Sequence, residues 1–273
     1  MVQASWRVRP ASVLYYPLAL FATFVGLVFA VQIVCLLILV DVGLRMLARP
    51  YKADGPVIAR VEQVGIATYR TPIRGVGAGP AGAGDVARTL PIVRDELRRY
   101  GPSVLPRAPL QTVVLCANIT SGGERAGGLT LSGQGVILLD VSPRGPGGDA
   151  DLRHAFHHEM SHVLDDAVPR DPAREAKWSR LNPADFAYGG VEVVRALETL
   201  GEDPRGRPDT AGFLTYYAMA SAGEDRAEIL AAMMVNPDVW RRVAAEDPIL
   251  RAKGRMLRSA LVAWDPGFAV LLP

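Results

Sequence analysis

The chain is poor in cysteine, lysine and histidine, and each shortage narrows the functions that are open to it. It has two cysteines in 273 residues: Cys35 lies in an apolar N-terminal run and Cys116 in a predicted strand, so the sequence encodes no disulfide framework. Lysine occurs three times against 27 arginines, yet the formal net charge is only +2, which excludes a charge-driven nucleic-acid binder. Since 49% of the residues are hydrophobic and 21% charged, we expect a globular protein with one strongly apolar segment.

That apolar segment lies near the N-terminus. Charged residues are absent from Pro10 to Val40, and Val13 to Val40 is almost wholly apolar or aromatic. A membrane-spanning helix needs about 20 such residues, whereas a cleavable signal has an apolar core of roughly 7–15. The sequence therefore predicts an uncleaved single-pass transmembrane helix, which forms an anchor and juxtamembrane stretch over residues 1–54.

The charges that flank this run do not settle its orientation. Arg7 and Arg9 precede it, and Arg45, Arg49 and Lys52 follow it, so the positive-inside rule leans toward a cytoplasmic C-terminal domain. Anchors of secreted-type hydrolases usually run the other way. From that comparison we expect the catalytic domain at the cell membrane, on its extracytoplasmic side; the flanking charges themselves do not determine the side.

Residues 55–273 are predicted to form one α+β domain, in which a small β-sheet packs on a helical half. Residues 71–85 are rich in glycine, alanine and proline and indicate a loop. After Pro146 the pattern is helical almost to the end. The elements expected before it are a helix over Val86–Tyr100 and strands over Leu110–Cys116, Ala126–Ser132 and Gly135–Val141.

The run His158-Glu159-Met160-Ser161-His162 carries the chemistry. It lies on a predicted helix that begins at Asp149 or Asp151 and ends near Asp166. The four-residue spacing places both imidazoles on one face, within reach of one ion, and Glu159 beside them can take a proton from a metal-bound water. This is the HExxH pattern of zinc hydrolases. With four histidines in the chain, we expect a chance match in fewer than about one such chain in a hundred.

The same helix carries an apolar stripe of Leu152, Phe156, Met160 and Val163, which predicts that one side packs while the other faces a cleft. His154 is in phase with His158, but one turn further back it is expected to lie beside the ligands or at the surface. His157 is expected to point elsewhere.

A catalytic zinc needs a third protein ligand. No histidine follows His162, which excludes the HExxHxxGxxH class and leaves Glu, Asp or Cys. Glu224 and Glu228 are one helical turn apart, so one can ligate while the other hydrogen-bonds a histidine. The stretch Ser221-Ala-Gly-Glu224 is equally a helix capping box, and the local pattern leaves both interpretations open. Cys116 precedes His158 at the spacing found in peptide deformylases, but without their surrounding motif; Asp165 and Asp166 lie too near on the same helix.

Three stretches resemble the gluzincin-type zinc-binding metallopeptidases, which are similar to the catalytic domain of anthrax lethal factor and to Pro-Pro endopeptidases. The resemblance covers roughly residues 150–236. It rests on HHEMSH at 157–162, on WSRLNP at 178–183 followed by Phe186 and Tyr188, and on GFLTYY at 212–217 leading into EDRAE at 224–228.

The resemblance implies a zincin-like fold, bound Zn²⁺ and a peptide or protein substrate. It implies that Glu224 is the third ligand, that Tyr217 hydrogen-bonds the developing oxyanion, and that Glu228 supports a ligand from behind. Arg226 departs from the family pattern, which has an aromatic residue there, and should affect packing more than chemistry. Trp178, Asn182, Phe186 and Tyr188 are candidates for the cleft wall, although the core is the usual place for such aromatics.

We therefore expect a membrane-anchored zinc metallopeptidase in which His158, His162 and Glu224 hold the metal and Glu159 is the general base. The alternatives are an inactive, membrane-tethered zincin-like scaffold and a non-peptidase zinc amidohydrolase. An intramembrane protease is excluded, because the motif lies far beyond the only apolar run. Gly127–Ser132 or Gly135–Val141 is the strand expected to pair with an extended substrate. The oligomeric state stays open.

Overall fold

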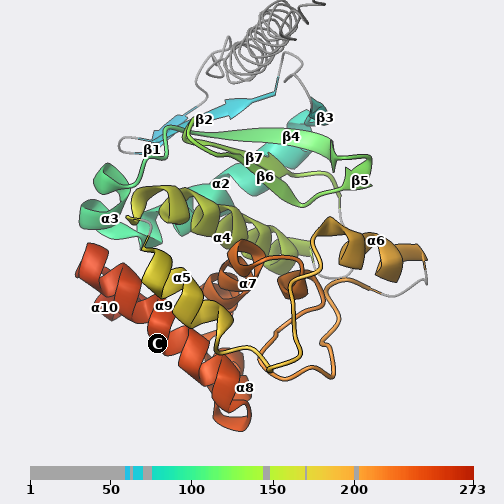
Figure 1. Ribbon diagram of the computed structural model, residues 1–273. Coiled ribbons are helices and arrows are strands. Elements are labelled where there is room, and N and C mark those ends of the chain that lie inside the picture. The colour runs from blue at the N-terminus through green and yellow to red at the C-terminus, as the bar shows by residue number, and fades with distance from the viewer. Residues whose placement is uncertain (1–58, 62–63, 70–75, 144–147, 170, 200–202) are drawn as a thin grey trace, which may run out of the picture. The chain divides into compact units, whose positions relative to one another are not determined.

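A computed structural model describes residues 59–61, 64–69, 76–143, 148–169, 171–199 and 203–273. In this part of the chain a mixed β-sheet lies on a group of helices, which confirms the predicted α+β class (Figure 1). The predicted transmembrane run and the predicted domain boundary at residue 54 fall outside these residues. Among the helices described, none has the length and apolar character needed to cross a membrane.

The sheet has seven strands, with the order β1-β2-β4-β7-β6 across its width. β4 runs parallel to β2 and β7, while β1 and β6 pair antiparallel at the two ends, so β6 is an edge strand. The far half of β4 also pairs with β3 and β5. The strands are β1 (Ala59–Val61), β2 (Val64–Thr68), β3 (Gly77–Pro80), β4 (Thr112–Ser121), β5 (Glu124–Arg125), β6 (Gly128–Leu131) and β7 (Val136–Asp140).

The three predicted strands correspond to β4, β6 and β7. The prediction of a loop over residues 71–85 is wrong in part, because β3 lies within it and α2 begins at Ala83. Gly77 of β3 packs directly on the Thr120 side chain, where a Cβ would collide. Glycine thus permits this close pairing, yet glycine-rich sequence normally indicates a turn.

The helices form the other half of the domain. They are α2 (Ala83–Arg99), α3 (Gly101–Arg107), α4 (Gly148–Ala167), α5 (Pro172–Ser179), α6 (Val191–Thr199), the 3₁₀ turn η2 (Tyr217–Met219), α7 (Ala222–Val235), α8 (Pro237–Glu246), α9 (Pro248–Trp264) and α10 (Phe268–Leu271). α4 is central: it contacts β6 and β7 on the sheet side and packs most extensively on α7 (Figure 1).

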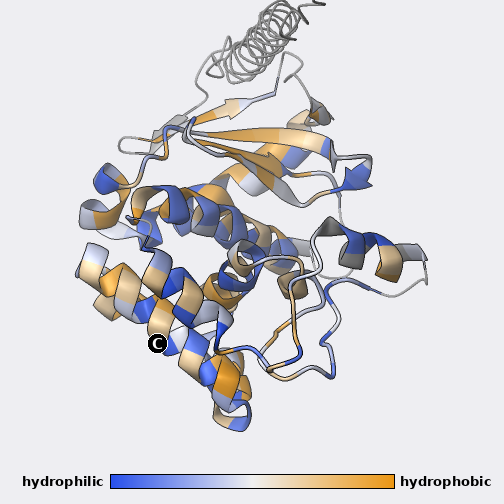
Figure 2. Cartoon of the chain, in the orientation of Figure 1, coloured by the Kyte–Doolittle hydropathy of each residue, from blue (hydrophilic) through white to orange (hydrophobic). Residues whose placement is uncertain are grey.

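The main core lies between the sheet and α4. The predicted apolar stripe of α4 is buried in it, together with sheet residues such as Ile66, Val113 and Ile137. Figure 2 shows the central strands mostly in hydrophobic colours, whereas α4 also carries many hydrophilic residues. Burying one stripe of α4 fixes the rotation of the helix, and the polar residues of its other side are thereby directed toward α7.

Candidate metal centre

The two motif histidines face each other on α4. His158 is buried and His162 half-buried, and their Nε2 atoms lie 3.3 Å apart with the rings in an edge-to-face arrangement. Both rings lie on the side of the helix that faces α7, as the four-residue spacing predicts.

Glu224 reaches the histidines from the first turn of α7. Its backbone N–H donates to the Oγ of Ser221, the N-cap residue, at 3.1 Å. In a complete capping box the glutamate side chain would turn back to the Ser221 N–H. Instead, Glu224 Oε2 lies 2.9 Å from His158 Nε2 and 3.4 Å from His162 Nε2. The Glu224 backbone therefore takes part in the cap while its side chain joins the histidines.

The donor set fits a zinc ion. In a tetrahedral site with Zn–N and Zn–O bonds of about 2.0–2.2 Å, ligand atoms lie about 3.3–3.6 Å from one another. The three ligand-type atoms of His158, His162 and Glu224 are separated by 2.9, 3.3 and 3.4 Å, close to that spacing. Two imidazole nitrogens and one carboxylate oxygen are also the ligand types of a catalytic zinc site with an open fourth position.

Glu228, one turn further along α7, holds His158 from the opposite side. Its Oε1 lies 2.8 Å from His158 Nδ1 and 3.1 Å from His154 Nε2, and its Oε2 accepts a hydrogen bond from Thr215 Oγ1 at 3.1 Å. In the tautomer with the proton on Nδ1, His158 donates to this buried carboxylate, and its Nε2 lone pair is directed at Glu224 and His162. His154, His158 and Glu228 also group three ligand-type atoms, but through Nδ1, which this hydrogen bond occupies.

The carboxylates of this cluster are held in their charged forms. Burial opposes ionisation of Glu224, but hydrogen bonds with His158 and His162 outweigh it and lower the pKa to about 2. Burial likewise opposes ionisation of Glu228, and the hydrogen bonds with His154 and His158 overcome it, so its pKa lies far below the usual range. Charged carboxylates are the form that ligates or orients a metal ligand.

The Glu159 side chain reaches β6, at the edge of the sheet. It is buried, and its Oε2 lies 2.8 Å from the hydroxyl oxygen of Thr130 in β6. Gly128, two residues earlier in β6, lies against the Glu159 side chain: a Cβ on that glycine would come within 2.5 Å of Glu159 Cγ. Burial lowers the pKa of His162, but the hydrogen bond with Glu224 and then the charge of Glu159 outweigh it and raise that pKa. Sequence reasoning missed Thr130 and Gly128, because nothing local indicates a contact across 29 residues.

The Tyr217 ring lies beside the His158 ring. It opens η2, and its ring centroid is 5.6 Å from that of His158. Burial first, and then the charges of Glu224, Glu159 and Glu228, raise its pKa well above the ordinary value. The phenol therefore keeps its proton at neutral pH and is a hydrogen-bond donor.

A buried ion pair anchors the first turn of α7. Asp225 Oδ2 lies 2.7 Å from Lys253 Nζ of α9 and accepts hydrogen bonds from Tyr188 OH at 2.8 Å and Trp178 Nε1 at 3.1 Å. Lys253 Nζ also donates to the Gly212 carbonyl at 2.7 Å and lies over the Phe213 ring. Two of the aromatics considered for the cleft wall thus support α7 instead: Trp178 is buried in the core, and the half-buried Tyr188 packs against it.

The residues weighed as rival ligands have other partners. Cys116 is buried in β4, with Sγ 3.6 Å from the Leu139 carbonyl, and burial raises the pKa of its thiol to about 12. Asp165 forms a two-oxygen ion pair with Arg226, and Asp166 accepts from the Gly133 N–H at 2.9 Å. The Arg226 guanidinium lies over the Trp178 ring, 5.6 Å from its centroid, and also pairs with Glu175.

His157 points away from the metal cluster, also as predicted. Its Nδ1 is 2.8 Å from Tyr100 OH and its Nε2 is 2.8 Å from Glu96 Oε2, both on or next to α2. Burial first, and then interactions that only partly oppose it, leave its pKa at about 4, so the ring is neutral at neutral pH. This network joins α4 to α2.

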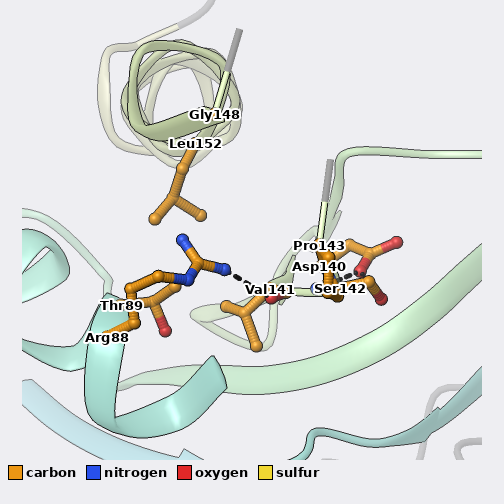
Figure 3. A pocket seen from close by; sticks show the side chains of 8 residues that line it. All are labelled: Arg88, Thr89, Asp140, Val141, Ser142, Pro143, Gly148 and Leu152. Atoms are coloured by element: carbon orange, nitrogen blue, oxygen red, sulfur yellow. Dashed lines mark hydrogen bonds between the residues drawn. The ribbon is translucent and has the colours of Figure 1, made fainter. Parts of the chain in front are cut away.

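Two hollows lie apart from the cluster. One, of about 170 Å³, lies at the N-terminal end of α4, where Arg88 donates a hydrogen bond to the Val141 carbonyl (Figure 3). Arg88 also pairs with Asp149. The other, of about 1020 Å³, runs between α5 and α9 and has Lys177 and Arg255 along it. Neither is lined by a residue of the metal cluster.

The fold and the cluster together define a class of protein: an α+β domain whose paired helices present two histidines and a glutamate in a zinc-type arrangement. Residues 110–256, more than half of the chain, match the model of the family described as "Putative zinc-binding metallo-peptidase". The chain belongs to this family. Membership supports a metallopeptidase function in general, with zinc as the metal and a protein or peptide as the substrate class.

Two further comparisons complete these findings. No curated protein matches the chain at a significant level. The crystal structure of a putative zinc-binding metallo-peptidase from Bacteroides caccae is similar at 16% sequence identity, over 77% of this chain and 85% of that chain, with a TM-score of 0.48. The family assignment rests on the sequence match alone.

Proposed function

We propose that the chain is a zinc-dependent peptidase of the gluzincin type, in which His158, His162 and Glu224 hold the metal. The observation that carries the proposal is the approach of their three ligand-type atoms to within 3.4 Å of one another. Glu228 supports it further, because its hydrogen bond to His158 Nδ1 directs the other ring nitrogen at the same point. Bound zinc supplies a Lewis acid, which lowers the pKa of water toward roughly 7 and polarises a carbonyl.

Glu159 is the general base in this proposal. It lies beside the ligand His158 in sequence and is buried at the junction of α4 and β6. It accepts a proton from the attacking water and returns it to the leaving amine. Tyr217, kept protonated by its surroundings, donates a hydrogen bond to the oxyanion that develops on the substrate carbonyl.

β6 is the strand proposed to pair with the substrate. Of the two strands considered from the sequence, β7 lies inside the sheet and β6 lies at one end of it. The Asp140 N–H donates to the Gly127 carbonyl, so the alternation of an antiparallel ladder places the backbone groups of Gly128 and Thr130 on the open side. A peptide added there would gain main-chain hydrogen bonds next to Glu159.

The proposal is tested on the full-length protein, purified with detergent present. We expect about one zinc per chain by elemental analysis and cleavage of a mixed peptide library. Glu159→Gln should keep the zinc and lose hydrolysis by about 10²–10⁴-fold or more, since it removes the base. Glu246→Gln, an exposed position at the end of α8, is the matched control. One bound zinc without cleavage would instead support the inactive scaffold, and cleavage of small amides but not peptides would support the amidohydrolase.

The membrane anchor belongs to the same proposal. Its support is the charge-free run from Pro10 to Val40, which is longer than a bilayer requires. The proposed location is the cell membrane with the catalytic domain outside the cytoplasm. In intact cells, protease added from outside should remove a tag at the C-terminus. A tag that stays protected on a membrane-bound chain would place the catalytic domain in the cytoplasm. A chain found in the soluble fraction would refute the proposed membrane anchor.

A further inference from the structure

Two residues of the edge strand contact the proposed base. Gly128 and Thr130 are two apart in β6, so both project from the same face of the sheet, the one that α4 covers. Gly128 leaves the space that the Glu159 side chain fills, and the Thr130 hydroxyl meets the end of that side chain. The position of the Glu159 side chain is therefore fixed by its contacts with Gly128 and Thr130 of β6 as well as by its own helix.

The Thr130 hydroxyl is well placed to fix the carboxylate. Its oxygen lies 2.8 Å from Glu159 Oε2 and 2.9 Å from the Glu159 backbone carbonyl. The hydroxyl has one proton, and the charged carboxylate is the stronger acceptor of the two. Threonine is β-branched and stiff at χ1, and antiparallel pairing with Ile137 fixes its backbone. The donor thus has little freedom to move.

The backbone of the same two residues faces the open edge. Gly128 and Thr130 occupy the non-hydrogen-bonded positions of the β6–β7 ladder, so their N–H and C=O groups point away from β7; Thr130 is half-buried and Gly128 is buried. A peptide paired with this edge would hydrogen-bond the backbone of the same residues that contact the Glu159 side chain. The substrate carbonyl and the base would then be aligned by one short strand.

We propose that Thr130 is a positioning residue for Glu159, and that β6 sets the base in register with a peptide bound to its edge. The inference rests on the proposed function, and it deepens that function by assigning a role to a residue outside the HExxH motif. Thr130 acts through Glu159 and requires no contact with the substrate side chains.

The test compares two substitutions of one residue in the full-length protein. Thr130→Val keeps the shape of the side chain and removes its hydroxyl, whereas Thr130→Ser keeps the hydroxyl. Since a misplaced catalytic group can cost about 100-fold, we expect Thr130→Val to lower kcat by about 10- to 100-fold at unchanged KM. Thr130→Ser should retain most of kcat, and zinc affinity should be the same in all three proteins.

A double substitution separates positioning from other roles. In a Glu159→Gln background the base is already gone, so adding Thr130→Val should lower the residual rate no further. The contact is also measured without activity: in metal-free protein, Thr130→Val should lower the midpoint of thermal unfolding by less when Glu159 is alanine than when it is present.

The outcomes are distinct. An active wild-type chain with Thr130→Val at wild-type kcat overturns the role of Thr130 and leaves the proposed function standing. That role is also overturned if valine and serine lose activity equally, if the loss falls on KM, or if the two substitutions add in full. A wild-type chain that binds zinc but cleaves no peptide overturns the proposed function, and the positioning role with it.

Discussion

Replacement of Glu228 should weaken zinc binding without removing a ligand. Glu228 accepts hydrogen bonds from His158, His154 and Thr215 and is itself buried. Glu228→Gln keeps the length of the side chain and one oxygen acceptor but removes the negative charge. Glu228→Ala removes the acceptor, so that nothing fixes the His158 tautomer and the ring can rotate away from Glu224.

The size of the loss follows from these contacts. Removing the hydrogen-bond partner of a ligating histidine typically weakens metal binding about 10- to 100-fold, or about 1.4–2.8 kcal/mol. The His158–Glu228 contact, at 2.8 Å, is buried and charge-assisted, so alanine should fall at the upper end and glutamine near about tenfold. Thr215→Val removes a neutral donor from the other oxygen, Oε2, and should cost less than either.

The measurement is a zinc dissociation constant, obtained by competition with a chromogenic chelator at fixed pH and salt. Glu246→Gln, exposed at the end of α8, should bind zinc as the wild type does. Unfolding of each metal-free variant checks that the fold is kept. Wild-type affinity in Glu228→Ala, with the fold intact, would refute the reasoning that this carboxylate orients His158.

Two further predictions concern stability. Lys253→Met leaves Asp225 buried without its cation and should cost about 3–5 kcal/mol of unfolding free energy in urea, while the double variant Lys253→Met, Asp225→Asn should recover part of it; an unchanged single variant would contradict this. Burial opposes ionisation of Glu96, but hydrogen bonds from His157 and Arg99 outweigh it and lower its pKa from 4.5 to about 2. Because the folded pKa is the lower one, this stabilisation is complete above pH 4.5 and is lost as the pH falls through about 2. The stability advantage of the wild type over Glu96→Gln should therefore shrink across that range, and a difference constant with pH would count against the ionised Glu96.

The sequence predicted the part of the site that is local. His158 and His162 share a helix face because of the helical repeat, and their placement needs no knowledge of the rest of the fold. Glu224 was different, because the local pattern fitted a helix cap equally well, and only the resemblance favoured a ligand. In the structure Ser221 caps the Glu224 backbone N–H, and the Glu224 side chain meets the histidines; its role as a ligand stays a prediction.

The contacts that no local pattern predicted join distant segments. Thr130 and Glu159 are 29 residues apart, and Lys253 and Asp225 lie on different helices. β3 was missed because Gly77 and Gly79 give no alternation of apolar and polar side chains. Long-range pairing depends on how elements pack, which periodicity alone does not specify.

The facing helices α4 and α7 carry ligand-type residues at intervals of one turn: His154, His158 and His162 on α4, and Glu224 and Glu228 on α7. Such a regular spacing does not by itself specify which histidine meets which carboxylate, because a shift of α7 by one turn would bring another histidine–carboxylate combination together. Residues next to Glu224 prevent this slip. Asp225 forms an ion pair with Lys253 of α9, and Arg226 forms one with Asp165 of α4. These two residues, which follow Glu224 directly, fix the position of Glu224 along α7 relative to α4. A designer who transplanted only the histidines and glutamates into another helix pair would copy the ligand-type residues without the contacts that set the position of one helix along the other.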